Sequence, residues 1–293
     1  MLLAISLLAL IHLFVARIVV VESTSMYATL LPGDLLLVDL VSMWDGPDRN
    51  DIVVFRDPIG DHLPIWEREL LVKRIVGMPG DKVQIRDGDL FVNEAYIPPP
   101  ERSTTSFVLR TSGSTPIDGI PGYLQLPIGA ISTKETPLVI PLNDSLAHLV
   151  KNAFPGIEVE LMGTSTGASL NIFPFSQQHR WNNDRFGPIE IPAKGDTIAI
   201  TTHNFPLYDR IMSKYEGHEL SVSGDTLLID GAELQEYVIE QDHYFMLGDS
   251  RDHSADSRYW GFVPADHLVG RVACIIASSG PNGARTDRVL RHP

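Results

Sequence analysis

Residues 70–97 read LLVKRIVGMPGDKVQIRDGDLFVNEAYI, a pattern typical of antiparallel β structure. The apolar run at 70–76 is short enough for a strand and ends at the turn residues of 77–81. Apolar and polar residues then alternate on both sides of Asp87-Gly88, and this dipeptide between alternating segments favours a β-hairpin. This stretch therefore predicts short strands joined by tight turns.

The same pattern extends in both directions along the chain. Residues 35–41 (LLLVDLV) and 51–55 (DIVVF) are short apolar runs between turn residues, and we expect both to be buried strands. Helical patterns are few: one covers 145–152 after the capping stretch Asn143-Asp144-Ser145, and one covers 206–215. The fold class is therefore predicted to be mainly β.

Composition excludes several classes of protein. The 293 residues are 44% hydrophobic and 20% charged, which excludes an intrinsically disordered chain. The formal net charge of −14, from 23 basic and 37 acidic residues, argues against a nucleic-acid partner, since such a protein must neutralise phosphates. The single cysteine, Cys274, excludes an internal disulfide framework and a cysteine-rich zinc site. We expect neither a metal nor a cofactor.

The first 21 residues, MLLAISLLALIHLFVARIVVV, differ sharply from the rest, since Arg17 is their only formal charge. About 20 apolar residues suffice for a helix to cross a bilayer. The alternative is a cleavable signal peptide, which has a basic start and a shorter apolar centre. Because this start has no Lys or Arg, we predict a transmembrane anchor over 1–21.

The character of the chain changes again after Pro98-Pro99-Pro100, where Ser, Thr, Gly and Pro become frequent. We interpret this region as an inserted, loop-rich β subdomain. The predicted organisation is an anchor at 1–21, a first core part at 22–97, the insertion at 98–190 and a second core part at 191–293.

Ser25 and Lys73 are the two candidate reactive residues, one in a turn and one in a strand. Ser25 follows the apolar segment in ESTSMYATLLPGD (22–34), and by itself such a serine is typical of a turn. Lys73 lies within an apolar strand, where desolvation would lower its pKa from about 10.4; a shift of roughly 3 units would make it a general base near pH 7. An edge strand with its lysine in water is the open alternative.

A dense charged segment occupies residues 248–258, GDSRDHSADSR, with three Asp and two Arg. Its acids lack the spacing of a calcium-binding EF-hand loop, and its arginines would repel a metal. We therefore expect a buried ion-pair network, with Arg74 as a further partner.

Taken together, these segments resemble the bacterial type I signal peptidases, membrane-anchored Ser/Lys proteases. The matching motifs occur in the family's order: Ser23-Thr-Ser25-Met with Thr29-Leu30-x-Pro-Gly-Asp34, Asp51-Ile-Val-Val-Phe55, Lys73-Arg74-x-Val-Gly-x-Pro-Gly-Asp81, and Gly248 to Phe262. The resemblance implies an N-terminal transmembrane helix followed by an antiparallel β catalytic core. It also implies removal of signal peptides from exported preproteins by a monomer. The enzyme would be a single-pass protein of the bacterial cytoplasmic membrane, in contact with the lipid bilayer, with its catalytic part on the periplasmic side.

The resemblance also implies roles for individual residues. Ser25 matches the nucleophile and Lys73 the general base, while Ser23 matches a hydroxyl that helps to form the oxyanion hole. Ser254 matches a serine that orients the lysine. The supporting ion-pair positions are Arg74, Asp249, Asp256 and Arg258.

Three positions depart from the family pattern. Ala28 replaces the usual proline of the first motif, and Ser250 and His253 stand where the family usually has asparagines. His253 is an alternative base, but Lys73 matches its own motif fully. The competing hypothesis is a specialised or non-catalytic anchored relative with narrow substrates.

Overall fold

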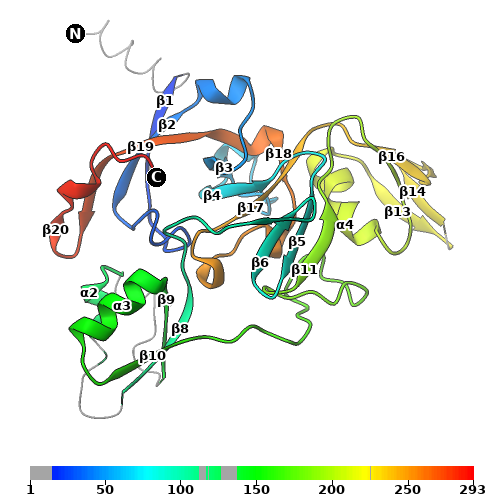
Figure 1. The fold of residues 1–293 in the computed structure, drawn as a ribbon. Coiled ribbons are helices and arrows are strands. Elements are labelled where there is room, and N and C mark those ends of the chain that lie inside the picture. Colours follow the sequence, from blue (N-terminus) through cyan, green and yellow to red (C-terminus); the bar gives the residue numbers. More distant parts are fainter. Residues whose placement is uncertain (1–14, 112–116, 118, 127–136, 225) are drawn as a thin grey trace, which may run out of the picture.

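The computed structural model describes residues 15–111, 117, 119–126, 137–224 and 226–293. The chain folds mainly into antiparallel sheets, as predicted (Figure 1). The largest sheet has eight strands in the order β1-β2-β19-β3-β4-β17-β18, with β20 paired to β19. Their bounds are Ala16–Val20 (β1), Asp34–Asp39 (β2), Ile52–Arg56 (β3), Leu70–Gly77 (β4), His243–Leu247 (β17), Val263–Pro264 (β18), Leu268–Gly280 (β19) and Gly283–Ala284 (β20).

Strand β4 lies inside this sheet. Its Lys73 is opposite Val53 of β3, and on the other side its Ile75 is opposite Met246 of β17. A strand with neighbours on both sides has no free edge, so the alternative of a lysine on an edge strand is wrong.

The predicted hairpin after β4 is confirmed and belongs to a second sheet, ordered β11-β5-β6-β7. Its strands are Lys82–Arg86 (β5), Asp89–Val92 (β6), Ala95–Ile97 (β7) and Phe186–Glu190 (β11). Asp87 and Gly88 both have positive φ, as a tight hairpin turn of this kind requires. A second turn, at Asn93-Glu94, was not predicted; both residues adopt positive φ although neither is glycine.

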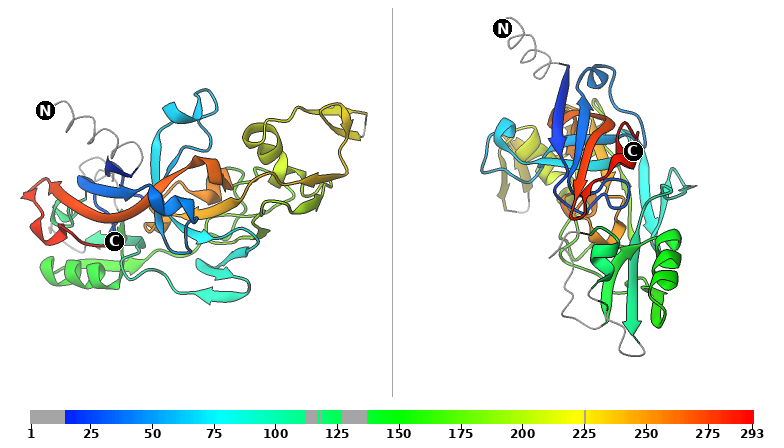
Figure 2. Two further views of the ribbon diagram at one scale, coloured as in Figure 1. Left: turned by 90° about the horizontal axis from the view of Figure 1, so that it is seen from above. Right: turned by 90° about the vertical axis from the view of Figure 1, so that its left-hand side faces the viewer.

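A smaller lobe contains the sheet β10-β8-β9, built from Thr105–Thr111 (β8), Leu138–Leu142 (β9) and Ile157–Leu161 (β10), with the helices Ile120–Tyr123 (α2) and Asp144–Ala153 (α3). Figure 1 and the right-hand view of Figure 2 show this lobe, mostly in green, below the main sheet. Its apolar core also takes in Tyr27, which lies two residues after Ser25. The lobe therefore packs directly on the turn that carries Ser25.

The remaining elements lie mostly at the end of the molecule far from β20 (Figure 2). The strands are Thr197–Ala199 (β12), Leu220–Ser223 (β13), Thr226–Ile229 (β14), Ala232–Glu233 (β15) and Glu236–Val238 (β16), and the helices are Phe205–Arg210 (α4) and Ser257–Trp260 (α5). The helix predicted over 206–215 is confirmed in place, but its second half, Ile211–Tyr215, is π-helical.

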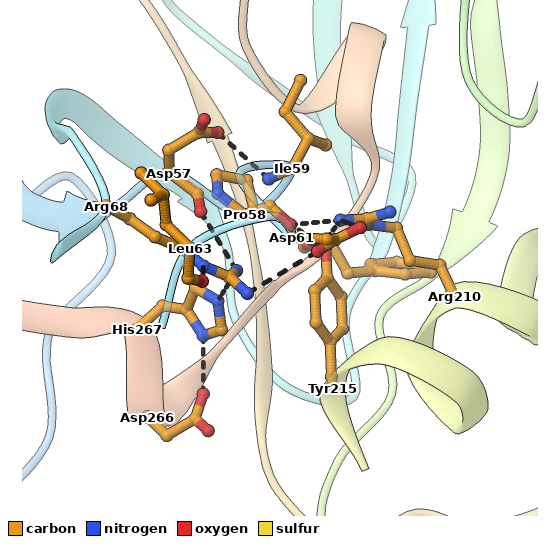
Figure 3. Close-up of polar contacts among 11 residues, drawn as sticks. Asp57, Pro58, Ile59, Asp61, Leu63, Arg68, Arg210, Tyr215, Asp266 and His267 are labelled. Carbon is orange, nitrogen blue, oxygen red and sulfur yellow. Dashed lines mark hydrogen bonds and ion pairs between the residues drawn. The ribbon is translucent and has the colours of Figure 1, made fainter. Parts of the chain in front are cut away.

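A polar cluster joins the loop between β3 and β4 to α4 (Figure 3). Arg210 donates to both carboxylate oxygens of Asp61, at 2.8 and 2.9 Å, and to the carbonyl of Pro58. Arg68 donates to the carbonyl of Leu63 and hydrogen-bonds with Nε2 of His267 at 3.1 Å. These contacts link residues 58–68 to α4 and to His267.

The predicted anchor over 1–21 needs correction. Residues 1–14 lie outside the described residues, but Ala16–Val20 form β1, with Ile18 opposite Leu37 of β2. Hydropathy does not distinguish an apolar helix from an apolar strand, and the β-branched residues at 18–21 favour a strand. Among the described residues, no helix is long and apolar enough to span a membrane.

The cap of α3 gives a test of the fold. Of the predicted capping stretch 143–145, it is Asn143 that accepts a hydrogen bond from the backbone N–H of Leu146, at 2.9 Å. We expect Asn143→Ala to lower the free energy of unfolding by about 1 kcal/mol in urea denaturation. Ser145→Ala, at an exposed position of the same helix, should change it by less than about 0.5 kcal/mol. Equal losses in both variants would contradict the capping role.

Candidate active site

The structure brings Ser25 and Lys73 into direct contact. Nζ of Lys73 donates a hydrogen bond to Oγ of Ser25 over 2.7 Å. The serine lies in the turn between β1 and β2, where the Tyr27 N–H donates to the Thr24 carbonyl. The lysine comes from the interior strand β4. Both residues are buried, with 8% of Ser25 and 4% of Lys73 exposed.

Burial changes the acidity of the lysine. Removal from water disfavours the ammonium form and lowers the pKa of Lys73 to about 8, although the nearby carboxylates of Asp256, Asp249 and Glu69 act in the opposite direction. Nζ makes one other hydrogen bond, to the carbonyl of Val72 at 3.0 Å. Just above neutral pH, a substantial fraction of Lys73 is therefore uncharged and can accept a proton.

Other predicted residues surround this pair. Oγ of Ser23 lies 3.1 Å from Oγ of Ser25. The Ser254 hydroxyl is buried nearby, but its hydrogen bond goes to the carbonyl of Ala255, at 3.2 Å, and not to Lys73. The predicted orienting role of Ser254 therefore stays a prediction.

A side chain larger than that of glycine does not fit at position 248. A Cβ atom at this position would lie 2.2 Å from Oγ of Ser254 and 2.4 Å from the carbonyl oxygen of Ser25. Only glycine allows the backbone to approach the Ser25 turn so closely.

Two buried ion pairs flank the site. Arg74 binds Asp249 with two hydrogen bonds, of 2.8 and 2.7 Å, and Arg258 binds Asp256 in the same bidentate way, at 2.9 and 2.8 Å. Asp256 also accepts from the N–H of Gly248, at 3.1 Å. The expected ion-pair network is therefore present. The Arg74–Asp249 pair connects the 248–258 segment to β4, and the Arg258–Asp256 pair lies within that segment.

Several residues of this region were not singled out from the sequence. Thr29 donates to the carboxylate of Asp249 at 2.5 Å. Asp34 is fully buried and binds Arg288 through hydrogen bonds of 2.6 and 3.0 Å, while the Ser278 hydroxyl donates to it at 2.6 Å. Thr29 and Asp34 lie within the first motif quoted above, and this could have marked them as residues of the site. Nothing in a single sequence marks Arg288 as the partner of Asp34.

The structure shows the contacts of the three residues that depart from the family pattern. The N–H of Ala28 donates to the Arg102 carbonyl at 3.2 Å, which a proline could not do. Oγ of Ser250 lies 3.1 Å from Oγ1 of Thr104. His253 hydrogen-bonds through Nε2 with the Ser106 hydroxyl, and among the described residues it makes no hydrogen bond with Ser25. Within the described part of the chain, no group of three His, Cys, Asp or Glu residues could hold a metal ion.

Comparison with known proteins identifies the family of the chain. The family model described as "Signal peptidase, peptidase S26" matches residues 1–115 and 188–277. The chain belongs to this signal peptidase family. It is therefore a peptidase, and hence a hydrolase.

Individual relatives are named signal peptidase I. The signal peptidase I of Buchnera aphidicola subsp. Baizongia pistaciae is 24% identical over 95% of this chain and 77% of its own length. That of Bacillus caldolyticus is 33% identical over 44% of this chain and 68% of its own. A solved signal peptidase I from Enterococcus faecalis V583 aligns over 77% of this chain and 96% of its own, with 17% identity and a TM-score of 0.27. The family assignment therefore depends on the sequence matches.

The buried lysine should weaken the folded state, and its removal tests this. We expect Lys73→Met to be more stable than the wild type at pH 7 by roughly 1–3 kcal/mol in urea denaturation, because methionine carries no charge into the apolar strand. The folded-state pKa of about 8 lies below the unfolded value of about 10.4, so the unfolded chain binds more protons between these limits. Wild-type stability should therefore rise across that interval, and the advantage of the variant should shrink by pH 10.

Lys82→Met, on the half-exposed face of β5, is the matched control for the same substitution outside the buried site, and it should not be more stable than the wild type at pH 7. A Lys73→Met protein less stable than the wild type by the same amount at pH 7 and pH 10 would show that burial does not disfavour the ammonium.

Proposed function

We propose that this chain is a serine endopeptidase that removes N-terminal signal peptides from exported preproteins, with Ser25 as the nucleophile and Lys73 as the general base. The observation that carries the proposal is the 2.7 Å hydrogen bond between Nζ of Lys73 and Oγ of Ser25 in a buried setting. The relatives named signal peptidase I support the substrate class.

The reaction follows from the chemistry of the pair. Uncharged Lys73 takes the proton of Ser25 as Oγ attacks the scissile carbonyl, and then delivers it to the leaving amine as the peptide bond breaks. The product is an ester between Ser25 and the signal peptide. Lys73 then activates a water molecule in the same way, and hydrolysis of the ester regenerates the hydroxyl.

The negative charge of the tetrahedral intermediate needs hydrogen-bond donors. The backbone N–H of Ser25 and the hydroxyl of Ser23 fill this role in our proposal, which is supported by the 3.1 Å separation of the two serine Oγ atoms. Loss of one such donor typically raises the barrier by about 3 kcal/mol. Ser254 helps to orient Lys73, and the four ion-pair residues hold the segments that carry these groups.

The substrate would bind as an extended strand next to the active-site strands, with small side chains at positions −1 and −3 relative to the cleavage site. We further propose a single-pass protein of the bacterial cytoplasmic membrane, with the catalytic part on the periplasmic side. The apolar sequence before β1 supports attachment to the bilayer, as do Ile18 and Val20 of this edge strand, each 52% exposed. The gap in the family match at residues 116–187 supports an insertion within the predicted range 98–190.

Substitution of each reacting residue tests the proposal. We expect Ser25→Ala and Lys73→Ala to reduce cleavage of a preprotein by the detergent-solubilised full chain at least about 10³-fold, because neither remaining residue can form the ester alone. Cleavage is measured by the appearance of the mature protein, and folding by circular dichroism.

Ser145→Ala and Lys82→Ala change the same residue types at exposed or half-exposed positions and should cleave at the wild-type rate. Full activity in Ser25→Ala or in Lys73→Ala would refute the proposed pair. A folded wild-type protein that cleaves no preprotein would favour a non-catalytic relative.

A further inference from the structure

Residues 102–106, here called the strap, run alongside the candidate active site without belonging to any of its motifs. Thr104 forms a parallel bridge with Ser250. Its N–H donates to the Asp249 carbonyl, and its own carbonyl accepts from the N–H of Arg251, both over 2.8 Å. The strap therefore pairs with the segment that begins at Gly248.

The side chain of Thr104 makes a second connection. Oγ1 donates to the carbonyl of Tyr27 over 2.9 Å and lies 3.1 Å from Oγ of Ser250. Only 1% of Thr104 is exposed, so no water competes for these hydrogen bonds. One hydroxyl thus contacts both the turn of the nucleophile and the 249–251 segment.

Both of these segments touch Ser25 itself. Tyr27 lies two residues after Ser25 in the same turn, and the N–H of Ser250 donates to the Ser25 carbonyl over 3.0 Å. On the strap, the Arg102 carbonyl accepts from Ala28. A shift of either segment would therefore move the backbone of Ser25 relative to Lys73, which is held separately by β4.

The other end of the strap continues this arrangement. The N–H of Ser106 donates to the Asp252 carboxylate over 2.6 Å, and its hydroxyl bonds with Nε2 of His253 at 3.2 Å. Tyr27 in turn extends into the core of the lobe that contains β8, where its hydroxyl donates to the Leu124 carbonyl over 3.0 Å. The strap is thus anchored on both sides, and Thr104 is at its centre.

We propose that Thr104 is a positioning residue for the Ser25 nucleophile, which it holds within hydrogen-bonding distance of Lys73 by tying the Tyr27 turn to Ser250. This inference rests on the proposed function of the Ser25–Lys73 pair. Thr104 touches no reacting atom and acts only through its neighbours. Displacement of a reacting group by about 1 Å can cost on the order of 10²-fold in rate, so such a tie affects kcat.

The test replaces the hydroxyl without changing the shape of the side chain. Thr104→Val keeps the backbone bridge and the volume but loses both side-chain hydrogen bonds, whereas Thr104→Ser keeps the hydroxyl. We expect kcat for preprotein cleavage by the full chain in detergent to fall at least about tenfold in Thr104→Val. KM should stay within about twofold, and Thr104→Ser should recover kcat to within about threefold of the wild type.

A control separates positioning from general loss of stability. Arg210→Met breaks the polar cluster of Figure 3, which lies between α4 and the loop that precedes β4, and should lower the melting temperature with kcat unchanged at temperatures well below melting. If Arg210→Met lowers kcat as much as Thr104→Val does, or if Thr104→Val retains wild-type kcat and KM, the positioning role is refuted.

Two further measurements keep the result decisive. If Thr104→Val does not fold, Ser250→Ala is used instead, because it removes the other hydroxyl of the Thr104–Ser250 hydrogen bond. A fall in kcat of at least about threefold with KM unchanged would support the proposal. An unchanged kcat would overturn it. Ser25→Ala is assayed alongside: its inactivity together with wild-type kcat in Thr104→Val would overturn the positioning role alone. Activity in Ser25→Ala would instead refute the proposed function.

Discussion

The hydrogen bond between Lys73 and Ser25 depends on a lysine that has been removed from water. Strand β4 carries Lys73 inside the main sheet, and the side chain is almost fully buried, with Nζ in contact with Oγ of Ser25. Burial lowers the pKa of Lys73 to about 8, and an uncharged amine can accept the serine proton. The same burial opposes folding, so the site keeps its reactivity at a cost in stability.

The ion pairs around the site fit this requirement. Free carboxylates beside Lys73 would stabilise the ammonium and raise its pKa, and Asp249 and Asp256 do act in this direction. Asp249, however, is bound in a bidentate way by the guanidinium of Arg74, and Asp256 by that of Arg258. Because the positive charges offset the negative ones, the carboxylates can hold the backbone in place while their effect on the lysine stays smaller than that of burial.

Local signals in the sequence predicted local structure well. The hairpin at Asp87-Gly88, the capping Asn143 and the apolar strand around Lys73 each depend on residues within a few positions of one another. Contacts between residues far apart in the sequence, such as the ion pair of Asp34 with Arg288, were not predictable from one sequence. The end of the apolar segment was misassigned because hydropathy has the same value in β1 as in a helix. The pairing of Ser25 with Lys73 was anticipated only through the family resemblance.

A direct titration of Lys73 is the most decisive measurement. Lysine labelled with ¹³C at Cε is incorporated into the full chain in detergent, and the Lys73 signal is identified by its absence from Lys73→Met. A chemical-shift midpoint at about pH 8 is the predicted result. At a pKa of about 8, roughly one lysine in ten is uncharged at pH 7, whereas a midpoint near the ordinary value of about 10.4 would leave fewer than about one in 10³ uncharged. The second result would contradict the role of Lys73 as the base that activates Ser25.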